Sequence, residues 1–160
     1  MNKKYMSAAI EQAKIAAQKG EVPVGAVIVK DDEIIAAAHN RCEELNDATA
    51  HAEMLAIIEA EKKLGNFRLN GCQLYVTLEP CPMCVGAAIN SRISEIVYGA
   101  SDFVKGALGS VVNLCTFDFP NKPEIFGGVC ESQTKDILTE FFKNRRNKEE
   151  KQNSKEEKNL

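Results

Sequence analysis

The sequence has few of the residues that prevent a chain from folding compactly. Of its 160 residues, 10 are Gly and 5 are Pro, while 44% are hydrophobic. This composition excludes the disordered, collagen-like and low-complexity classes for the body of the chain. No stretch approaches the roughly 18 uninterrupted apolar residues of a membrane helix, and the first residues lead into no signal-peptide core. We therefore expect a cytoplasmic protein with no membrane partner.

The sequence also lacks an excess of basic residues. Lys and Arg number 20 against 23 Asp and Glu, which gives a formal net charge of −3. Nucleic-acid-binding domains usually carry a basic excess, so the total charge argues mildly against such a partner. A local basic patch can nevertheless exist within an acidic total, so this class stays open.

Six cysteines occur in a chain with no export signal, at positions 42, 72, 81, 84, 115 and 130. This setting favours reduced thiols or metal ligation over disulfides. A chain of this length hides roughly 70% of the surface that its unfolded form exposes, so one domain with a real core needs no such cross-links.

Hydrophobic periodicity predicts alternating helices and strands. We expect helices at 2–18, at 50–64 with Asp47 or Thr49 as N-cap, at 81–90 and at 134–146, with a helical turn near 111–112. We expect strands at 24–29, 34–38, 73–77, 95–98 and 124–129. This order predicts an α/β fold, a three-layer α/β/α sandwich with a central mixed five-stranded sheet. The single domain spans 1–146, and the polar segment 147–160 is expected to be a disordered tail.

Two short clusters carry the candidate chemistry, His51-Ala52-Glu53 and Pro80-Cys81-Pro82-Met83-Cys84. A C-x-x-C pair alone is ambiguous between zinc ligation and redox chemistry. Both clusters lie at expected helix N-termini, where the positive end of the helix dipole favours the thiolate that zinc requires. His51, Cys81 and Cys84 supply three ligands, and an open fourth position is typical of catalytic zinc.

The remaining cysteines and His39 have no partner at metal-ligand spacing. Cys42, Cys72, Cys115 and Cys130 are therefore interpreted as free thiols. His39 is interpreted as a residue on the surface or at the end of a strand, without a catalytic role.

Glu53 follows His51 by two residues, so on a helix it points about 200° away from the ligand. In a first turn that packs on the metal pocket, its carboxylate can lie beside the metal without binding it. Zinc lowers the pKa of bound water from about 15.7 towards about 7, and a neighbouring carboxylate can collect the released proton. The alternative is an exposed first-turn Glu that the helix dipole favours.

The spacing H-x-E followed by P-C-x-x-C is the signature of the zinc-dependent nucleobase deaminases. The surrounding segments extend the likeness. Residues 1–146 resemble the bacterial tRNA-specific adenosine deaminases, of the cytidine deaminase-like superfamily. The segments that carry this resemblance are 21–26, 49–53, 77–84, 91–100, Asp102, the 106–110 loop and 141–146.

This resemblance implies hydrolytic deamination of the wobble adenosine of tRNA to inosine, with release of ammonia. It implies that His51, Cys81 and Cys84 hold one zinc ion per subunit and that Glu53 shuttles the proton of zinc-activated water. By the same resemblance, Asn40 hydrogen-bonds the flipped base and Asp102 lies near its sugar. A turn or cap role for Asn40 and a loop-capping role for Asp102 are the alternatives.

The implied partner is the anticodon stem-loop of tRNA, by resemblance that of tRNA-Arg, and the implied assembly is a homodimer. Lys143, Arg145 and Arg146 would contact stem phosphates, although a solvated helix face explains them equally well. Phe141 and Phe142 are interpreted first as core residues, with base stacking by one of them as the alternative. The sequence departs from the family pattern at Ala48, Val104-Lys105 and Lys122. We expect these departures to affect the docking of the anticodon loop and not the deamination reaction.

Two other functions remain open from the residues. A free-base or nucleoside deaminase acting on guanine, cytosine or cytidine would share the zinc site. A zinc-stabilised RNA-binding module would have no catalytic role, but a structural zinc site has no use for a carboxylate such as Glu53 beside it.

Overall fold

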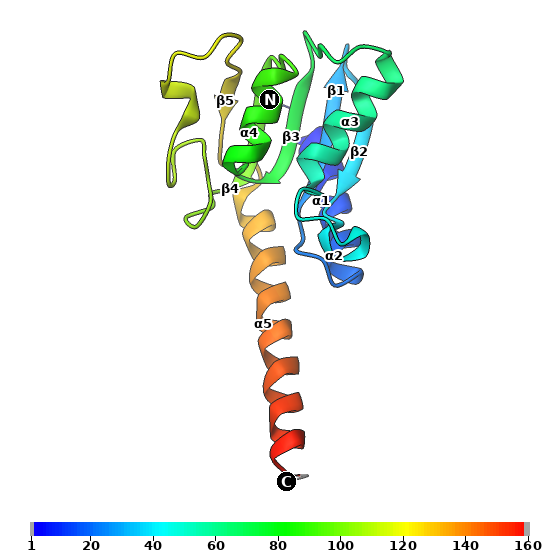
Figure 1. The fold of residues 1–160 in the computed structure, drawn as a ribbon, viewed down its shortest axis with the longest axis vertical. Coiled ribbons are helices and arrows are strands. Elements are labelled where there is room, and N and C mark those ends of the chain that lie inside the picture. The colour runs from blue at the N-terminus through cyan, green and yellow to red at the C-terminus, as the bar shows by residue number, and fades with distance from the viewer. Residues whose placement is uncertain (1, 159–160) are drawn as a thin grey trace.

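The computed structural model describes residues 2–158 (Figure 1). Its helices are α1 (Lys3–Gln18), α2 (Cys42–Leu45), α3 (Ala52–Leu64), α4 (Pro82–Asn90) and α5 (Glu131–Glu157), with a short 3-10 helix η1 (Leu114–Thr116). Its strands are β1 (Gly25–Lys30), β2 (Glu33–His39), β3 (Gln73–Leu78), β4 (Glu95–Ala100) and β5 (Glu124–Phe126).

The five strands form one mixed sheet in the order β2-β1-β3-β4-β5. β1 runs antiparallel to both β2 and β3, whereas β3, β4 and β5 are parallel. The β1–β2 hairpin closes at Asp31 and Asp32, whose φ angles of 48° and 63° are those of the tight turns that suit a two-residue hairpin. The predicted mixed five-stranded sheet is confirmed.

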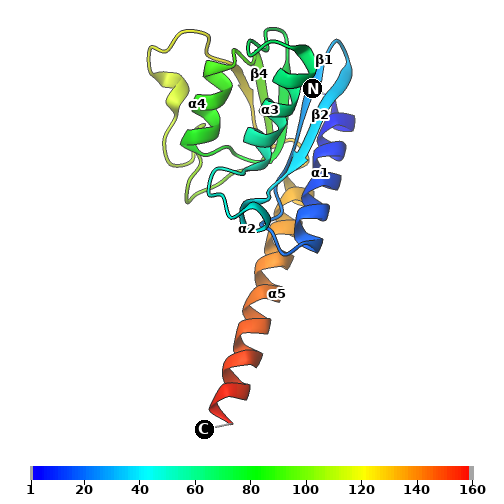
Figure 2. The same ribbon diagram turned by 45° about the vertical axis from the view of Figure 1, so that its right-hand side comes forward.

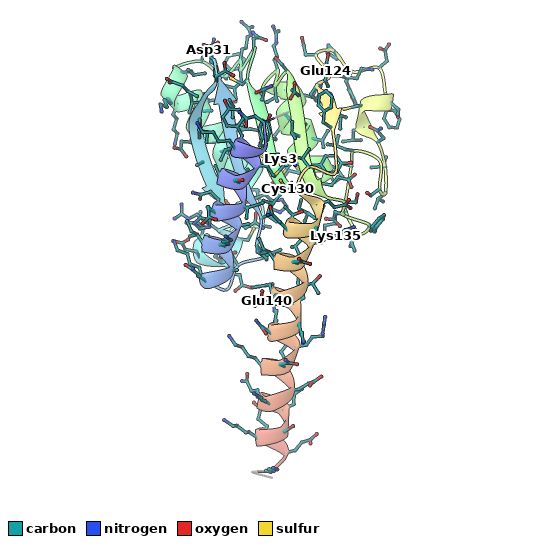
Figure 3. All side chains as sticks on the ribbon, turned by 180° about the vertical axis from the view of Figure 1, so that it is seen from behind. Lys3, Asp31, Glu124, Cys130, Lys135 and Glu140 are labelled. Atoms are coloured by element: carbon teal, nitrogen blue, oxygen red, sulfur yellow. The ribbon has the colours of Figure 1, made fainter. Side chains whose placement is uncertain are left out.

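Helices cover both faces of this sheet (Figure 2). Because successive strand residues point to opposite faces, Ala26 and Ile28 pack in the core with α3 and α4, while Val27 and Val29 pack against α1. The first turns of α5 lie beside α1 on the second face, where Lys3 and Cys130 mark the starts of the two elements (Figure 3). The three-layer α/β/α sandwich is therefore confirmed.

The sheet topology sets the position of the candidate site. β3 and β4 are neighbouring parallel strands, so their carboxyl ends, Leu78 and Ala100, meet at one edge. Ligands of α/β sheets bind outside this end of the strands. α4 begins there directly after β3, and α3 packs beside α4 on the same face.

The C-terminal segment differs from the sequence prediction. The expected disordered tail at 147–160 is wrong for most of its length, because α5 continues as a helix to Glu157. This part is rich in Glu and Lys, which have high helix propensity, and Arg145, just before it, pairs with Glu149 one turn later at 3.7 Å. Apolar periodicity predicts helices that pack on a core. It does not predict the last turns of α5, which project into solvent (Figure 3). The last two residues lie outside the described chain.

Smaller differences concern local structure. The short helix α2 was not expected, and the helical turn predicted near 111–112 occurs at η1 instead. The last strand ends at Phe126 and not at residue 129. The N-cap of α3 is His51 and not Asp47 or Thr49. Asp47 instead accepts hydrogen bonds from Thr49 in a turn before the helix.

Within residues 2–158, no helix combines the length and apolar character needed to cross a membrane.

Candidate active site

The three candidate ligands occupy the first turns of α3 and α4. His51 and Cys81 are the N-cap residues, with extended backbone angles of φ −73°, ψ 150° and φ −75°, ψ 171°. Pro82 occupies the first turn of α4, where its missing N–H has no partner to lose. Cys84 lies one turn into the same helix. The chain therefore brings residues about 30 positions apart to the positive ends of two neighbouring helices.

Their donor atoms converge. His51 Nδ1 lies 3.5 Å from Cys84 Sγ and 3.6 Å from Cys81 Sγ. All three ligand atoms lie within 4.8 Å of one another. The cluster offers one nitrogen and two sulfurs, a donor set that suits zinc and other thiophilic metals.

The electrostatics of the cluster favour a thiolate. The hydrogen bond from Cys84, assisted by His51, lowers the pKa of Cys81 to about 4. The pKa of Cys84 moves the opposite way, because this thiol donates to Cys81 and is buried. The hydrogen bond to Cys81 raises the pKa of His51. Cys81 is therefore the thiol of this pair that ionises more readily, and the thiolate is the form in which cysteine binds a metal.

Glu53 lies against this cluster but is not among the three grouped ligands. Its side chain is 4% exposed, and its Oε2 is the buried side-chain oxygen that has no hydrogen-bond partner among the described residues. Burial raises the pKa of Glu53 to about 7. The interpretation as an exposed first-turn Glu is therefore wrong. A buried, unpaired carboxyl oxygen is costly for a fold, which indicates that its partner is a ligand or water.

The cluster and Glu53 face a cavity of about 700 Å³. This volume is in the range of small-molecule and cofactor sites. The cavity is lined by residues of the segment before β1, of α2 and the segments on either side of it, of α3, the β3–α4 junction, the loop after β4, and α5: Val22, Val24, Asn40, Cys42, Ala48, His51, Glu53, Leu78, Glu79, Cys81, Ser101, Asp102, Phe103, Val104, Lys105, Leu138 and Phe142.

Asn40 and Asp102 both line this cavity and both have a structural role. Asn40 Oδ1 accepts a hydrogen bond of 2.8 Å from the backbone N–H of Ala52, which caps the start of α3. Asp102 Oδ1 accepts from the backbone N–H groups of Val104 and Lys105, at 2.9 and 3.1 Å. The capping interpretations therefore hold for both residues, while their positions leave them within reach of a ligand.

Glu79 is a residue of the site that the sequence analysis missed. It is 2% exposed and accepts hydrogen bonds from the backbone N–H groups of Asp102, Leu108 and Ser110 and from the Ser110 hydroxyl. Burial alone would raise its pKa, but these hydrogen bonds outweigh burial and lower it. A carboxylate that bonds mainly to backbone donors far along the chain leaves no sequence pattern.

Gly106 completes the junction that Glu79 organises. A Cβ at this position would lie 2.4 Å from the backbone oxygen of Asp102 and 2.5 Å from Glu79 Cδ. The loop can therefore close over the carboxylate only because residue 106 has no side chain.

We predict that Glu79→Ala destabilises the protein by about 3 kcal/mol, because it leaves several buried donors without an acceptor. Urea unfolding measures this loss. Glu124→Ala is the matched control, since Glu124 is exposed at the start of β5, and we expect a change within about 0.5 kcal/mol. Equal stability of the two variants would show that Glu79 does not hold the loop.

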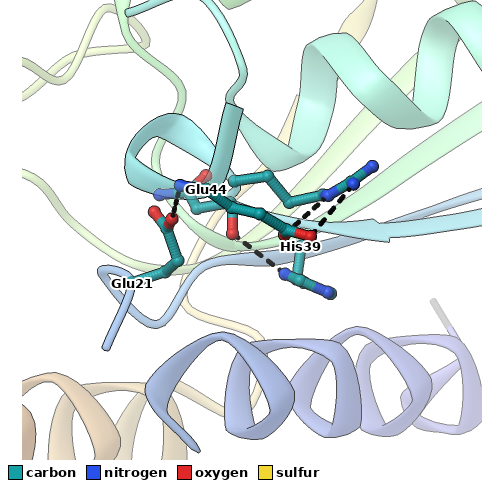
Figure 4. Close-up of polar contacts among 5 residues, drawn as sticks. Glu21, His39 and Glu44 are labelled. Atoms are coloured by element: carbon teal, nitrogen blue, oxygen red, sulfur yellow. Dashed lines mark hydrogen bonds and ion pairs between the residues drawn. The ribbon is translucent and has the colours of Figure 1, made fainter. Parts of the chain in front are cut away.

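His39 lies apart from the metal cluster. Its Nδ1 is 2.9 Å from the backbone oxygen of Asn40, at the end of β2 (Figure 4). Beside it, Glu21 accepts a 2.8 Å hydrogen bond from the backbone N–H of Glu44 and so fixes α2. These contacts place His39 at a strand end, where the sequence analysis put it.

The C-terminal candidates are distributed along α5. Phe142 is 39% exposed and lines the cavity with Leu138, so it is not a core residue. Arg145 is exposed and lies 3.8 Å from Glu43, and Lys143 and Arg146 are also exposed. These basic side chains therefore belong to the same helix as Leu138 and Phe142, which line the cavity.

A family model described as MafB19-like deaminase matches residues 1–146. The chain belongs to this deaminase family. The match covers the whole α/β/α body and ends within α5, so the last turns of this helix lie beyond the matched residues.

Individual deaminases agree closely with this chain. It is 50% identical over 145 residues to the tRNA-specific adenosine deaminase of Bacillus subtilis, covering 90% of each chain. A solved structure from a study of A-to-I editing by tRNA:A34 deaminases at the wobble position matches with a TM-score of 0.84 and 43% identity, over 86% of this chain and 100% of that one. The resemblance stated from the sequence is confirmed.

The guanine deaminase of Bacillus subtilis is a more distant match. Its structure has a TM-score of 0.60 and 36% identity, over 70% of this chain and 83% of that one.

Proposed function

We propose that this protein deaminates adenosine at the wobble position of tRNA, giving inosine and ammonia. The observation that carries this proposal is the buried carboxyl of Glu53 beside the His51–Cys81–Cys84 cluster, at an open cavity in a chain 50% identical to a tRNA-specific adenosine deaminase. The cluster supports hydrolytic deamination, and the relatives support the tRNA substrate.

Zinc is the metal that the cluster would hold. Imidazole nitrogen and thiolate sulfur are common ligands of zinc in proteins, and a nitrogen and a sulfur that bind one such ion lie roughly 3.5 Å apart. The observed separations of 3.5 and 3.6 Å agree with this value. With three protein ligands, His51, Cys81 and Cys84, such an ion keeps a position for solvent.

When bound, zinc lowers the pKa of a water molecule and so supplies a nucleophile at neutral pH. Glu53 would accept the proton that the attacking water gives up, and its carboxyl would deliver that proton to N1 of adenine. It would then help to protonate the amine that leaves C6. Its position supports this role, because a buried carboxyl that lines the cavity can exchange protons directly with groups bound there.

The remaining residues would position the RNA. Asn40, which caps α3, would hydrogen-bond the flipped base, and Asp102 would lie near its sugar. Lys143, Arg145 and Arg146 would contact phosphates of the anticodon stem. We expect this tRNA to be tRNA-Arg. The cytoplasmic location stays a prediction.

We also propose a homodimer. Val111, Phe117 and Phe119 are 57%, 53% and 45% exposed in the segment between β4 and β5. Apolar side chains grouped on one surface segment are typical of a protein interface.

The competing function is deamination of a free base, and the structural similarity to guanine deaminase supports it as the alternative. A direct comparison distinguishes the two. The purified, zinc-loaded protein is incubated separately with tRNA-Arg, guanine and cytidine, and ammonia and inosine are measured. We expect inosine at the first anticodon position and no ammonia from the free compounds. Turnover of guanine without turnover of tRNA would overturn the proposal.

A further inference from the structure

The mouth of the cavity carries two apolar side chains that are almost fully exposed. Phe103 is 77% exposed and Val104 is 80% exposed, more than the other large hydrophobic residues exposed in the described chain. Both line the cavity that Glu53 faces. An aromatic ring held in water at the edge of a site indicates a partner that covers it when the ligand is bound.

The turn that carries Phe103 is fixed on both sides. Asp102 receives the backbone N–H groups of Val104 and Lys105 on its carboxylate, and its own N–H donates 3.0 Å to the buried Glu79. After the turn, the Gly106 N–H donates 2.8 Å back to the Asp102 carbonyl. The position of Phe103 is therefore set before any ligand arrives, which lowers the entropy lost on binding.

The surroundings of Phe103 suit a nucleotide. Lys105, two residues further along, is exposed and lines the same cavity, where its ammonium can reach a phosphate. Phe142 of α5 lines the cavity from another element. Aromatic rings and cations around a groove are the means by which proteins hold single-stranded nucleic acid without reading its sequence.

We propose that Phe103 stacks on a nucleobase next to the target adenosine in the RNA, and so positions the loop for insertion of the target base. This inference rests on the proposed function and adds a positioning residue to it. A target base that leaves its stack deprives its neighbours of a partner, and an exposed ring at the cavity mouth can replace that partner.

The test compares four variants on an anticodon stem-loop RNA. Phe103→Ala removes the ring, Phe103→Leu keeps apolar volume without a π face, and Phe103→Tyr keeps the ring. Phe67→Ala is the control, because Phe67 is also an exposed ring, at 64%, but is not among the residues that line the cavity. We expect Phe103→Ala to raise Kd and KM about 10-fold. Phe103→Leu should lose a similar factor, whereas Phe103→Tyr and Phe67→Ala should stay within about twofold of the parent protein.

A second set of RNAs identifies the stacked base. Each carries an abasic residue on one side of the target adenosine or on the other. If Phe103 stacks on one of these bases, the RNA that lacks this base should bind the parent protein about 10-fold more weakly. On that RNA, Phe103→Ala should cause no further loss of binding. Independent, additive losses for both abasic RNAs would overturn the proposal.

Two further measurements distinguish base stacking by Phe103 from a role in subunit contact and from the deamination step. Sedimentation of Phe103→Ala should give the same oligomeric state as the parent, and dissociation would instead assign Phe103 to a subunit interface. Anisotropy with labelled RNA reports binding without catalysis. If the parent binds the stem-loop but does not deaminate it, the proposed function fails while the stacking test still gives a result.

Discussion

Replacing Glu53 with alanine will lower kcat on the order of 10²–10⁴-fold while the protein keeps its fold and its metal. The carboxyl is buried beside the three ligands, and its Oε2 has no partner among the described residues. Its removal therefore leaves no donor to Oε2 without a partner, so we expect the fold to persist. It does remove the group that would carry a proton between water and the base. Initial rates of inosine formation, with metal content and thermal unfolding on the same samples, measure the three quantities.

Two variants sharpen this experiment. Glu53→Gln keeps the shape of the side chain but cannot accept a proton, so it should lose as much activity as alanine. Glu59→Ala changes an exposed carboxylate on the same helix and should leave kcat unchanged. Activity of Glu53→Gln near that of the parent protein would remove the proposed proton transfer.

Replacing a candidate ligand will abolish both metal binding and activity. In Cys81→Ser and His51→Ala, only two of the three converging donor atoms remain, so we expect less than about a tenth of the parent metal content after dialysis. The free energy that the metal adds to folding is lost with it, and the melting temperature should fall. Metal analysis and calorimetry measure both effects.

Cys115→Ser is the matched control. Cys115 is a partly buried thiol in η1, outside the three-residue cluster, and its replacement should leave the metal content unchanged. If Cys81→Ser retained a full equivalent of metal and full activity, the cluster would not be the catalytic metal site.

The candidate metal site was predictable because its chemistry is local. His51 and Glu53 lie two residues apart, Cys81 and Cys84 three apart, and each pair begins a helix whose pattern is recognisable. Convergence of the two helix ends followed from the alternation of strands and helices. The distances of 3.5 and 3.6 Å between the ligand atoms show that they do converge.

The supporting residues could not be predicted in the same way. Glu79 bonds to backbone groups up to 31 positions later in the chain, and any residue type could supply those N–H groups. Asn40 caps a helix that begins 12 residues further on. Such contacts depend on loop closure, which neither composition nor periodicity encodes. The length of α5 was missed for the opposite reason, because its last turns are helical by local propensity and contact no core.

The amino-acid sequence alone determined the alternation of elements, the mixed sheet, the candidate ligands and the candidate acid near them, since these follow from residue type and short spacing. Only the tertiary structure decided that Glu53 is buried with its Oε2 unpaired among the described residues, that Glu79 holds the loop over the cavity, and that Phe103 is exposed at its mouth. Burial and exposure are properties of surfaces brought together by the whole fold, so the same side chain can be solvated or enclosed with no change in its neighbours along the chain.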